Sequence, residues 1–160
     1  MTTTITGALG IDNIKAATGA VLQVVSATFG TNTSTTSTSF VNTPVALSIT
    51  PTSTSSKILI MVSTPMYAAN ANTYAARFTI FRGTVSGVNL GDSSLGFGNQ
   101  WSSTGGTSLS VTASMSFLDS PSTTSSQAYT VGIRSEGNNS AATIMQSNAK
   151  ATITLMEIAG

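Results

Sequence analysis

One apolar run limits what this chain can fold into more than any other stretch. It covers Ile58–Val62 (Ile-Leu-Ile-Met-Val) and follows Lys57 and a polar turn that begins at Pro51. Pro51 has no N–H and a fixed φ, so it cannot continue a strand ladder, and the Ser and Thr residues after it favour a turn. The run is too short to cross a bilayer, which needs about 20 apolar residues. The sequence therefore predicts a buried β-strand directly after this turn.

Both faces of this predicted strand are apolar. Because strand side chains alternate, Ile58 and Ile60 point one way and Leu59 and Met61 the other. A sandwich strand needs only one apolar face, yet the pattern recurs in residues 21–25 and 153–158. Surplus apolar faces predict a partner surface, and identical chains cover such surfaces most simply in a closed symmetric oligomer. The predicted oligomer interface comprises Leu59, Met61, Val21, Val25, Met156 and Ile158.

The rest of the chain also has β patterning, and no stretch keeps a helical period. The clearest signal lies in residues 107–118, where apolar side chains alternate with Ser and Thr as in an antiparallel strand. We predict an all-β fold, an antiparallel sandwich of about eight strands of jelly-roll or Greek-key type. The domain spans 20–160 and follows an N-terminal arm, 1–19. Expected strands are 20–28, 40–50, 58–65, 73–81, 88–90, 95–101, 107–118, 127–135, 142–145 and 150–158, with loops at 31–39 and 67–72.

Composition narrows the class of protein. The chain has 160 residues, enough for one domain with a core, and 40% of them are hydrophobic, so a folded protein is expected. The net charge is +1 and only 7% of residues are charged, which argues against binding to a nucleic-acid backbone. The N-terminus has no basic segment and no long apolar segment, so we expect no secretory signal and no membrane insertion. Because Cys and His are both absent, no metal or other cofactor is expected.

The usual catalytic groups are missing. Without His no Ser-His-Asp triad can form. The acids are isolated in sequence, although a carboxylate pair assembled in space stays open as a small-hydrolase alternative. We expect a protein that is not an enzyme. Arg77, Arg82 and Arg134 are expected to form structural ion pairs with the few acids, which are Asp12, Asp92, Asp119, Glu136 and Glu157.

Two groups of residues suit sugar recognition. Trp101, the one tryptophan, could stack against a sugar ring, with Asn99 and Gln100 as hydrogen-bonding neighbours. A second group contains Tyr67, Asn70, Asn72 and Tyr74, because Asn and Tyr in loops suit adaptable recognition. Both groups also suit ordinary core and turn positions. The functional hypothesis from them is a stand-alone lectin or adhesin that recognises cell-surface glycans through Trp101, Gln100, Asn70, Asn72 and Tyr67.

Five segments in a fixed order resemble a known family. The chain is similar, over about residues 20–160, to a β-sandwich domain found in structural proteins of tailed bacteriophages, often those of marine and freshwater hosts including cyanobacteria. In that family the domain commonly looks like the exposed C-terminal part of tail fibres. The segments that carry the resemblance are Val21-Leu-Gln-Val-Val-Ser-Ala-Thr, Thr36-Ser-Thr-Ser-Phe-Val, residues Ile49–Val62, Ser116-Phe-Leu-Asp-Ser-Pro and Ala151-Thr-Ile-Thr-Leu-Met-Glu-Ile.

The resemblance implies a non-enzymatic protein on the exterior of a virion. It implies a trimer of jelly rolls akin to the tumour-necrosis-factor or C1q arrangement, with possible contact to host surface polysaccharide. Only about 20 residues precede the domain, where a long fibre would carry a shaft. A short arm and one jelly roll also suit a capsid decoration protein or a small tail or baseplate appendage. The expected partners are sister subunits and, through the arm, other virion proteins.

Overall fold

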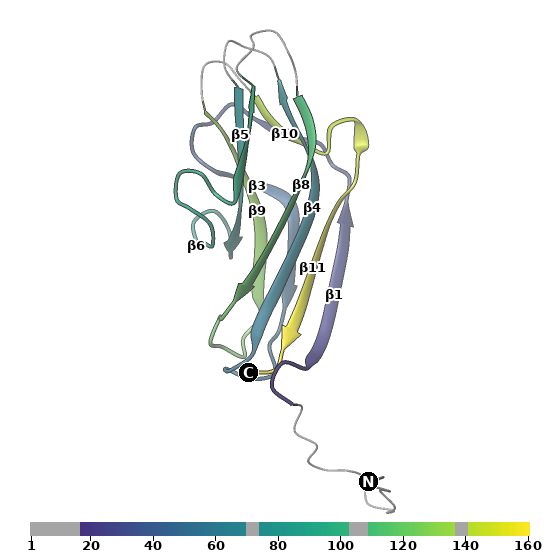
Figure 1. Ribbon diagram of the computed structural model, residues 1–160, viewed down its shortest axis with the longest axis vertical. Coiled ribbons are helices and arrows are strands. Elements are labelled where there is room, and N and C mark those ends of the chain that lie inside the picture. Colours follow the sequence, from purple (N-terminus) through teal and green to yellow (C-terminus); the bar gives the residue numbers. More distant parts are fainter. Residues whose placement is uncertain (1–16, 70–73, 103–108, 137–140) are drawn as a thin grey trace, which may run out of the picture.

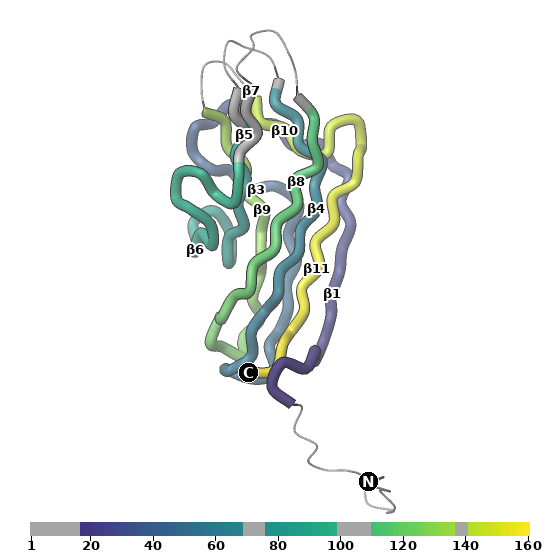
Figure 2. Tube along the Cα trace, viewed as in Figure 1, coloured from purple at the N-terminus to yellow at the C-terminus, as the bar shows by residue number. Residues whose placement is uncertain are grey.

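Two antiparallel sheets pack face to face along the long axis of the domain (Figures 1 and 2). The computed structural model describes residues 17–69, 74–102, 109–136 and 141–160. Within them the one helical element is a short 3-10 turn, η1 (Gln146–Asn148). The all-β antiparallel sandwich predicted from the sequence is confirmed. Residues 1–16 of the predicted arm lie outside the described residues.

The first sheet is built around the long strand β4. In the half of the sheet next to residue 20, four strands lie side by side, with β4 between β11 and β8, and β1 outside β11. In the other half, β10 replaces β11 beside β4 and β2 lies outside it. The bounds are β1 (Val21–Phe29), β2 (Thr33–Thr35), β4 (Lys57–Ala69), β8 (Leu109–Asp119), β10 (Ala141–Ile144) and β11 (Ala151–Ile158).

The second sheet has the order β3-β9-β5, and the free edge of β5 pairs with β6 and β7. Numbered in chain order, the eight strands of five or more residues run 1-8-3-6 in the first sheet and 2-7-4-5 in the second. This strand order is that of a jelly roll, in which successive strands alternate between sheets except for the fourth and fifth, which pair with each other in the second sheet. The bounds are β3 (Val41–Ile49), β5 (Tyr74–Arg82), β6 (Val88–Asn89), β7 (Gly98–Ser102) and β9 (Gln127–Ser135).

The longest strand runs further than the sequence predicts. Pro65 was the expected end of this strand, with a loop from Tyr67, but β4 continues to Ala69. Pro65 lies where the neighbour of β4 changes, since β11 pairs as far as Ser63 and β10 pairs from Met66. A residue at this junction has no partner in β10 or β11, so its missing N–H costs little there. The short strand β2 lies inside the predicted 31–39 loop, because Ser and Thr give no apolar alternation to mark it.

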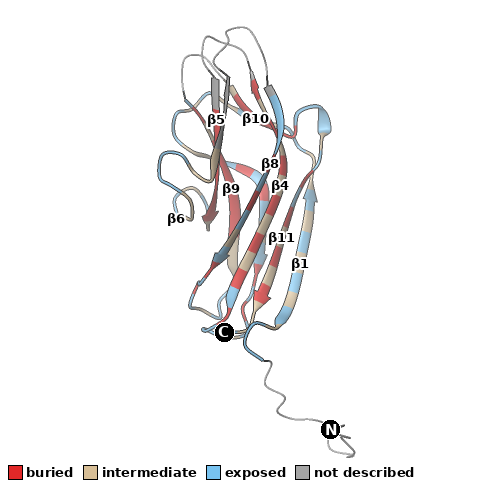
Figure 3. Cartoon of the chain, viewed as in Figure 1, coloured by how far each residue is buried: buried red, intermediate tan, exposed pale blue. Residues whose placement is uncertain are grey.

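The core lies between the sheets and takes one face of each strand. From β4 it receives Ile58, Ile60 and Val62, which are nearly or fully buried. Figure 3 shows this as stripes along β4 and β11, where buried residues alternate with partly exposed ones. The facing sheet contributes Ile80 and Val131. The predicted alternation of β4, with Ile58 and Ile60 on one face and Leu59 and Met61 on the other, is therefore confirmed.

Hydrogen bonds to two carboxylates connect neighbouring elements at the end of the sandwich next to residue 20. The Asp119 carboxylate accepts hydrogen bonds from Tyr129 Oη (2.8 Å) and Arg82 Nη2 (2.9 Å), which joins β8 to the facing sheet. The Glu157 carboxylate accepts hydrogen bonds from the Gln23 amide (2.6 Å) and from Thr52 N and Oγ1 (2.7 Å each). Where the domain begins and ends, Gly19 N donates to Ala159 O and Ala159 N donates to Ala20 O, both at 2.8 Å.

Candidate functional site

A row of apolar side chains crosses the outer face of the first sheet. Val24 lies opposite Met156, Met156 opposite Leu59, and Leu59 opposite Leu118, on four adjacent strands. Their strand neighbours Ile58 and Ile60 fill the core, so this row points outward. Val24 is 52% exposed and Leu118 47%, and the other two are half-buried. These four residues are called the outer apolar row.

Further apolar residues adjoin the outer apolar row. Met61 and Ile158 lie on the same face and are half-buried, and Val21, opposite Ile158, is 54% exposed. Towards the other half of the sheet the face becomes polar, with Ser26 hydrogen-bonded to Thr154 across two strands. The apolar area therefore lies at the end of the sheet where the domain begins and ends (Figure 1).

The structure divides the predicted interface residues between two faces. Leu59, Met61, Met156, Ile158 and Val21 lie on the outer face or its margin, whereas Val25 faces inward and packs against the core. The predicted set lacks Val24 and Leu118. Leu118 could have been recognised as unusual from the sequence alone. It is an apolar residue on the polar face of β8, the face that also carries Ser114 and Ser116.

The second sheet carries a hollow on its own outer face. Its volume is about 530 Å³. The segment 83–97 folds over this face, held by Leu90 N to Ile80 O (2.9 Å) and Phe97 N to Phe78 O (3.0 Å). The residues that line the hollow are Thr38, Ser39, Phe40, Phe81, Val85, Asn89, Ser93, Ser94 and Arg134.

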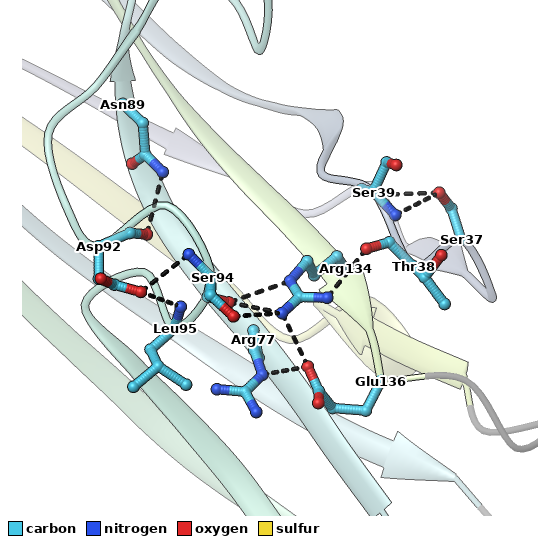
Figure 4. A network of polar contacts seen from close by, with 10 residues as sticks. All are labelled: Ser37, Thr38, Ser39, Arg77, Asn89, Asp92, Ser94, Leu95, Arg134 and Glu136. Atoms are coloured by element: carbon cyan, nitrogen blue, oxygen red, sulfur yellow. Dashed lines mark hydrogen bonds and ion pairs between the residues drawn. The ribbon is translucent and has the colours of Figure 1, made fainter.

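Arg134 joins the two sides of this hollow (Figure 4). Its Nη1 donates to Thr38 O (2.9 Å) on one side, and its Nη2 donates to Ser94 O (2.6 Å) on the other. Its guanidinium lies over the Phe40 ring at 5.5 Å, a cation–π arrangement. The Phe40 ring in turn meets Phe81 edge to face at 5.7 Å. Arg134 therefore holds the two loops on either side of the hollow and the Phe40 ring at its base, which is called the floor.

Charges around the hollow are balanced. Glu136 forms ion pairs with Arg77 and with Arg134. The hydrogen bond from Arg77 is the main cause that holds the pKa of Glu136 below its usual value. The amide N–H groups of Leu95 and Ser94 lower the pKa of Asp92 in the same way. Two cations and two anions share this region, as expected for structural ion pairs, and with Arg82–Asp119 they confirm the predicted roles of the three arginines.

The residues predicted to contact glycans are only partly described. Gln100 and Trp101 belong to β7, where their backbones pair with Ala76 and Ala75 of β5. Their side chains, and all of Asn70 and Asn72, lie outside the described part of the structure. Tyr67 is half-buried on the outer face of β4, in the other sheet. These predicted contacts stay predictions, and the hollow beside Arg134 was not among them.

The described ranges contain neither a candidate metal cluster nor a helix that could span a membrane. There, no group of three or more acids could hold a metal ion. No helix among those residues has the length and hydropathy to span a bilayer. The donor sets that a metal would need are also scarce in the sequence, which has five acids and no Cys or His.

Comparisons with known proteins identify no family for this chain. No protein-family model matches the chain, and no curated protein matches it. Among solved structures, the chain is similar to one in the crystal structure of the infectious bursal disease virus VP2 subviral particle, with 14% identity and a TM-score of 0.36. The match covers 97% of this chain and 43% of that chain, so this chain spans less than half of that protein. A similarity at this level carries no argument about function.

Proposed function

We propose that this protein is a non-enzymatic structural component on the exterior of a bacteriophage virion and assembles as a homotrimer. The outer apolar row is the observation that supports the proposed oligomer. A sandwich that worked alone would place polar side chains on that face, as β8 does with Ser110, Thr112, Ser114 and Ser116. Burial of exposed apolar area between sister subunits is the favourable term that drives such association. The virion setting is supported by the family resemblance of the sequence.

The non-enzymatic part of the proposal is supported by how the acids are used. Among the described residues, each carboxylate already has structural partners: Asp119 holds Arg82 and Tyr129, and Glu136 holds two arginines. Glu157 binds the 50–56 turn, and Asp92 binds backbone amides of its own loop. A general acid or base needs a proton that it can exchange with substrate, and carboxylates engaged in this way are poorly suited to that role.

The oligomer is tested by placing charge on the outer apolar row. We expect wild-type protein at micromolar concentration to give a three-chain mass by native mass spectrometry. The double variant Val24→Lys, Leu118→Lys should be a folded monomer, because lysines that are well solvated on one chain would be desolvated between chains. Val88→Lys is the matched control, since Val88 is 53% exposed but lies on β6 in the other sheet. A wild-type monomer, or a double variant that stays trimeric, would count against the proposal.

The arm is tested separately. We expect deletion of residues 1–17 to leave the trimer intact but to prevent incorporation into virus particles, because the proposed anchor would be lost while the outer apolar row remains. The measurement is the amount of the protein in purified particles, with trimer mass as the control. Unchanged incorporation would contradict an anchoring role for the arm.

A further inference from the structure

We propose that the hollow on the outer face of the second sheet binds a neutral sugar ring. This site differs from the predicted Trp101 group, and it does not rest on the virion proposal. Four features of the hollow favour such a ligand: its floor, its rim, the rigidity of its walls and its charge.

The floor offers an apolar patch of the kind that a sugar ring can cover. Phe40 is half-buried and lines the hollow together with Phe81, which is 4% exposed, and Val85. The Phe40–Phe81 contact is close to perpendicular, at 73°. Gly132 permits this arrangement, because a Cβ there would lie 2.6 Å from Cε2 of Phe81. Ligand sites combine apolar and polar groups, and here three apolar residues form the floor while the other lining residues are polar.

The rim provides free hydrogen-bonding groups. The hydroxyls of Thr38, Ser39 and Ser93 line the hollow and have no hydrogen-bond partner among the described residues. A hydroxyl can both donate and accept, which matches the hydroxyls of a sugar. Serine is also small, so the rim leaves the hollow open where larger side chains would fill it. The rim therefore suits a ligand rich in hydroxyl groups.

The walls are fixed before any ligand arrives. On one side, Ser135 N donates to Ser37 O (2.7 Å), which anchors the 37–40 loop to β9. On the other side, Asn89 Oδ1 accepts from Thr79 Oγ1 (2.5 Å) and Gly91 N (3.0 Å), and Asn42 Oδ1 accepts from Val85 N (2.9 Å). Arg134 connects the two sides. A site that is already ordered loses less conformational entropy on binding, which favours affinity.

The charge of the site selects a neutral ligand over an acidic one. The lining contains a cation, Arg134, and no carboxylate. That cation is already engaged by the carbonyl oxygens of Thr38 and Ser94 and by Glu136. A ligand carboxylate would have to compete with these partners and would lie near Glu136. Hydroxyl groups on a neutral ring meet no such repulsion.

The test is saturation-transfer NMR on the full chain. The probes are the methyl glycosides of glucose, galactose, mannose and N-acetylglucosamine at millimolar concentration, with methyl glucuronide as the acidic probe. We expect transfer to the ring protons of at least one neutral probe. Ser93→Trp should abolish it by filling the hollow, and the loop should stay folded because Ser93 is exposed and its side chain forms no hydrogen bond with the described residues. Thr124→Trp is the control, exposed in the turn between β8 and β9.

A second variant probes the floor. Phe40→Leu keeps an apolar side chain but removes the ring, and we expect about tenfold weaker binding of the neutral probe that wild type binds, equivalent to ~1.4 kcal/mol. No transfer to any neutral probe, transfer to methyl glucuronide alone, or transfer that Ser93→Trp leaves unchanged would each overturn the proposal. Circular dichroism of each variant shows that the sandwich is intact.

Discussion

Glu157 is one of two carboxylates that hold together the end of the sandwich next to residue 20. Glu157 is fully buried on the inner face of β11, where alternation would place an apolar residue. Burial raises its pKa, but hydrogen bonds from Gln23 and Thr52 outweigh that effect and lower the pKa to about 2. Since Gln23 also donates to Thr50 O at 2.7 Å, one polar cluster joins β1, β11 and the turn that Pro51 begins. The buried acid is tolerated because its hydrogen bonds are satisfied.

Glu157 predicts a pH dependence of stability. A carboxyl whose pKa is lowered on folding stabilises the folded state fully above its unfolded pKa, 4.5, and the contribution is lost as pH falls toward about 2. Glu157→Gln, which keeps the shape but not the charge, should cost about 1–3 kcal/mol of unfolding free energy at neutral pH. The difference from wild type should shrink through that acid window. Thermal unfolding of both proteins across the window measures it, and a difference that does not change with pH would contradict the assignment.

One glycine, Gly96, determines how the segment between β5 and β7 packs against β5. Gly96 has φ +67° in the left-handed region, and a Cβ there would lie 2.2 Å from Phe78 O. Its backbone also closes a local turn, donating to Asp92 O (2.9 Å) while Gly96 O accepts from Asp92 N (3.1 Å). The close approach brings the 83–97 segment onto β5 and so forms one wall of the hollow.

Gly96→Ala should therefore be more destabilising than backbone strain alone explains. Gly19→Ala is the matched control, because Gly19 has φ +86° but nothing lies within 4 Å of the added Cβ. We expect Gly19→Ala to lower the free energy of unfolding by about 1–2 kcal/mol, because of backbone strain. Gly96→Ala should cost about 1–3 kcal/mol more, because the backbone around Phe78 must shift. Chemical denaturation compares the two, and equal costs would mean that the segment adjusts without penalty.

For the whole molecule, most of the sandwich could be predicted and most of the surface could not. Period-two alternation predicted β8 and β9 almost to the residue, because in each strand apolar side chains occupy alternate positions. β2 was missed, since Thr and Ser give no contrast between faces. The outer apolar row could be predicted in part from Leu59 and Met156, but Leu118 needed the register of β8 against β4. The hollow depends on two loops, far apart in the sequence, that meet at Arg134 of β9, and no local pattern reveals this.

The pairing of Ala20 with Ala159 has a consequence for how such a domain can be reused. Because these two residues are neighbours, chain segments before and after the domain would leave it at the same point. In any longer chain the fold would therefore be attached at one position. A unit with adjoining entry and exit can be spliced into a surface loop of an unrelated scaffold with little disturbance to either. A jelly roll with adjacent ends is therefore suited to insertion into other proteins as a complete unit.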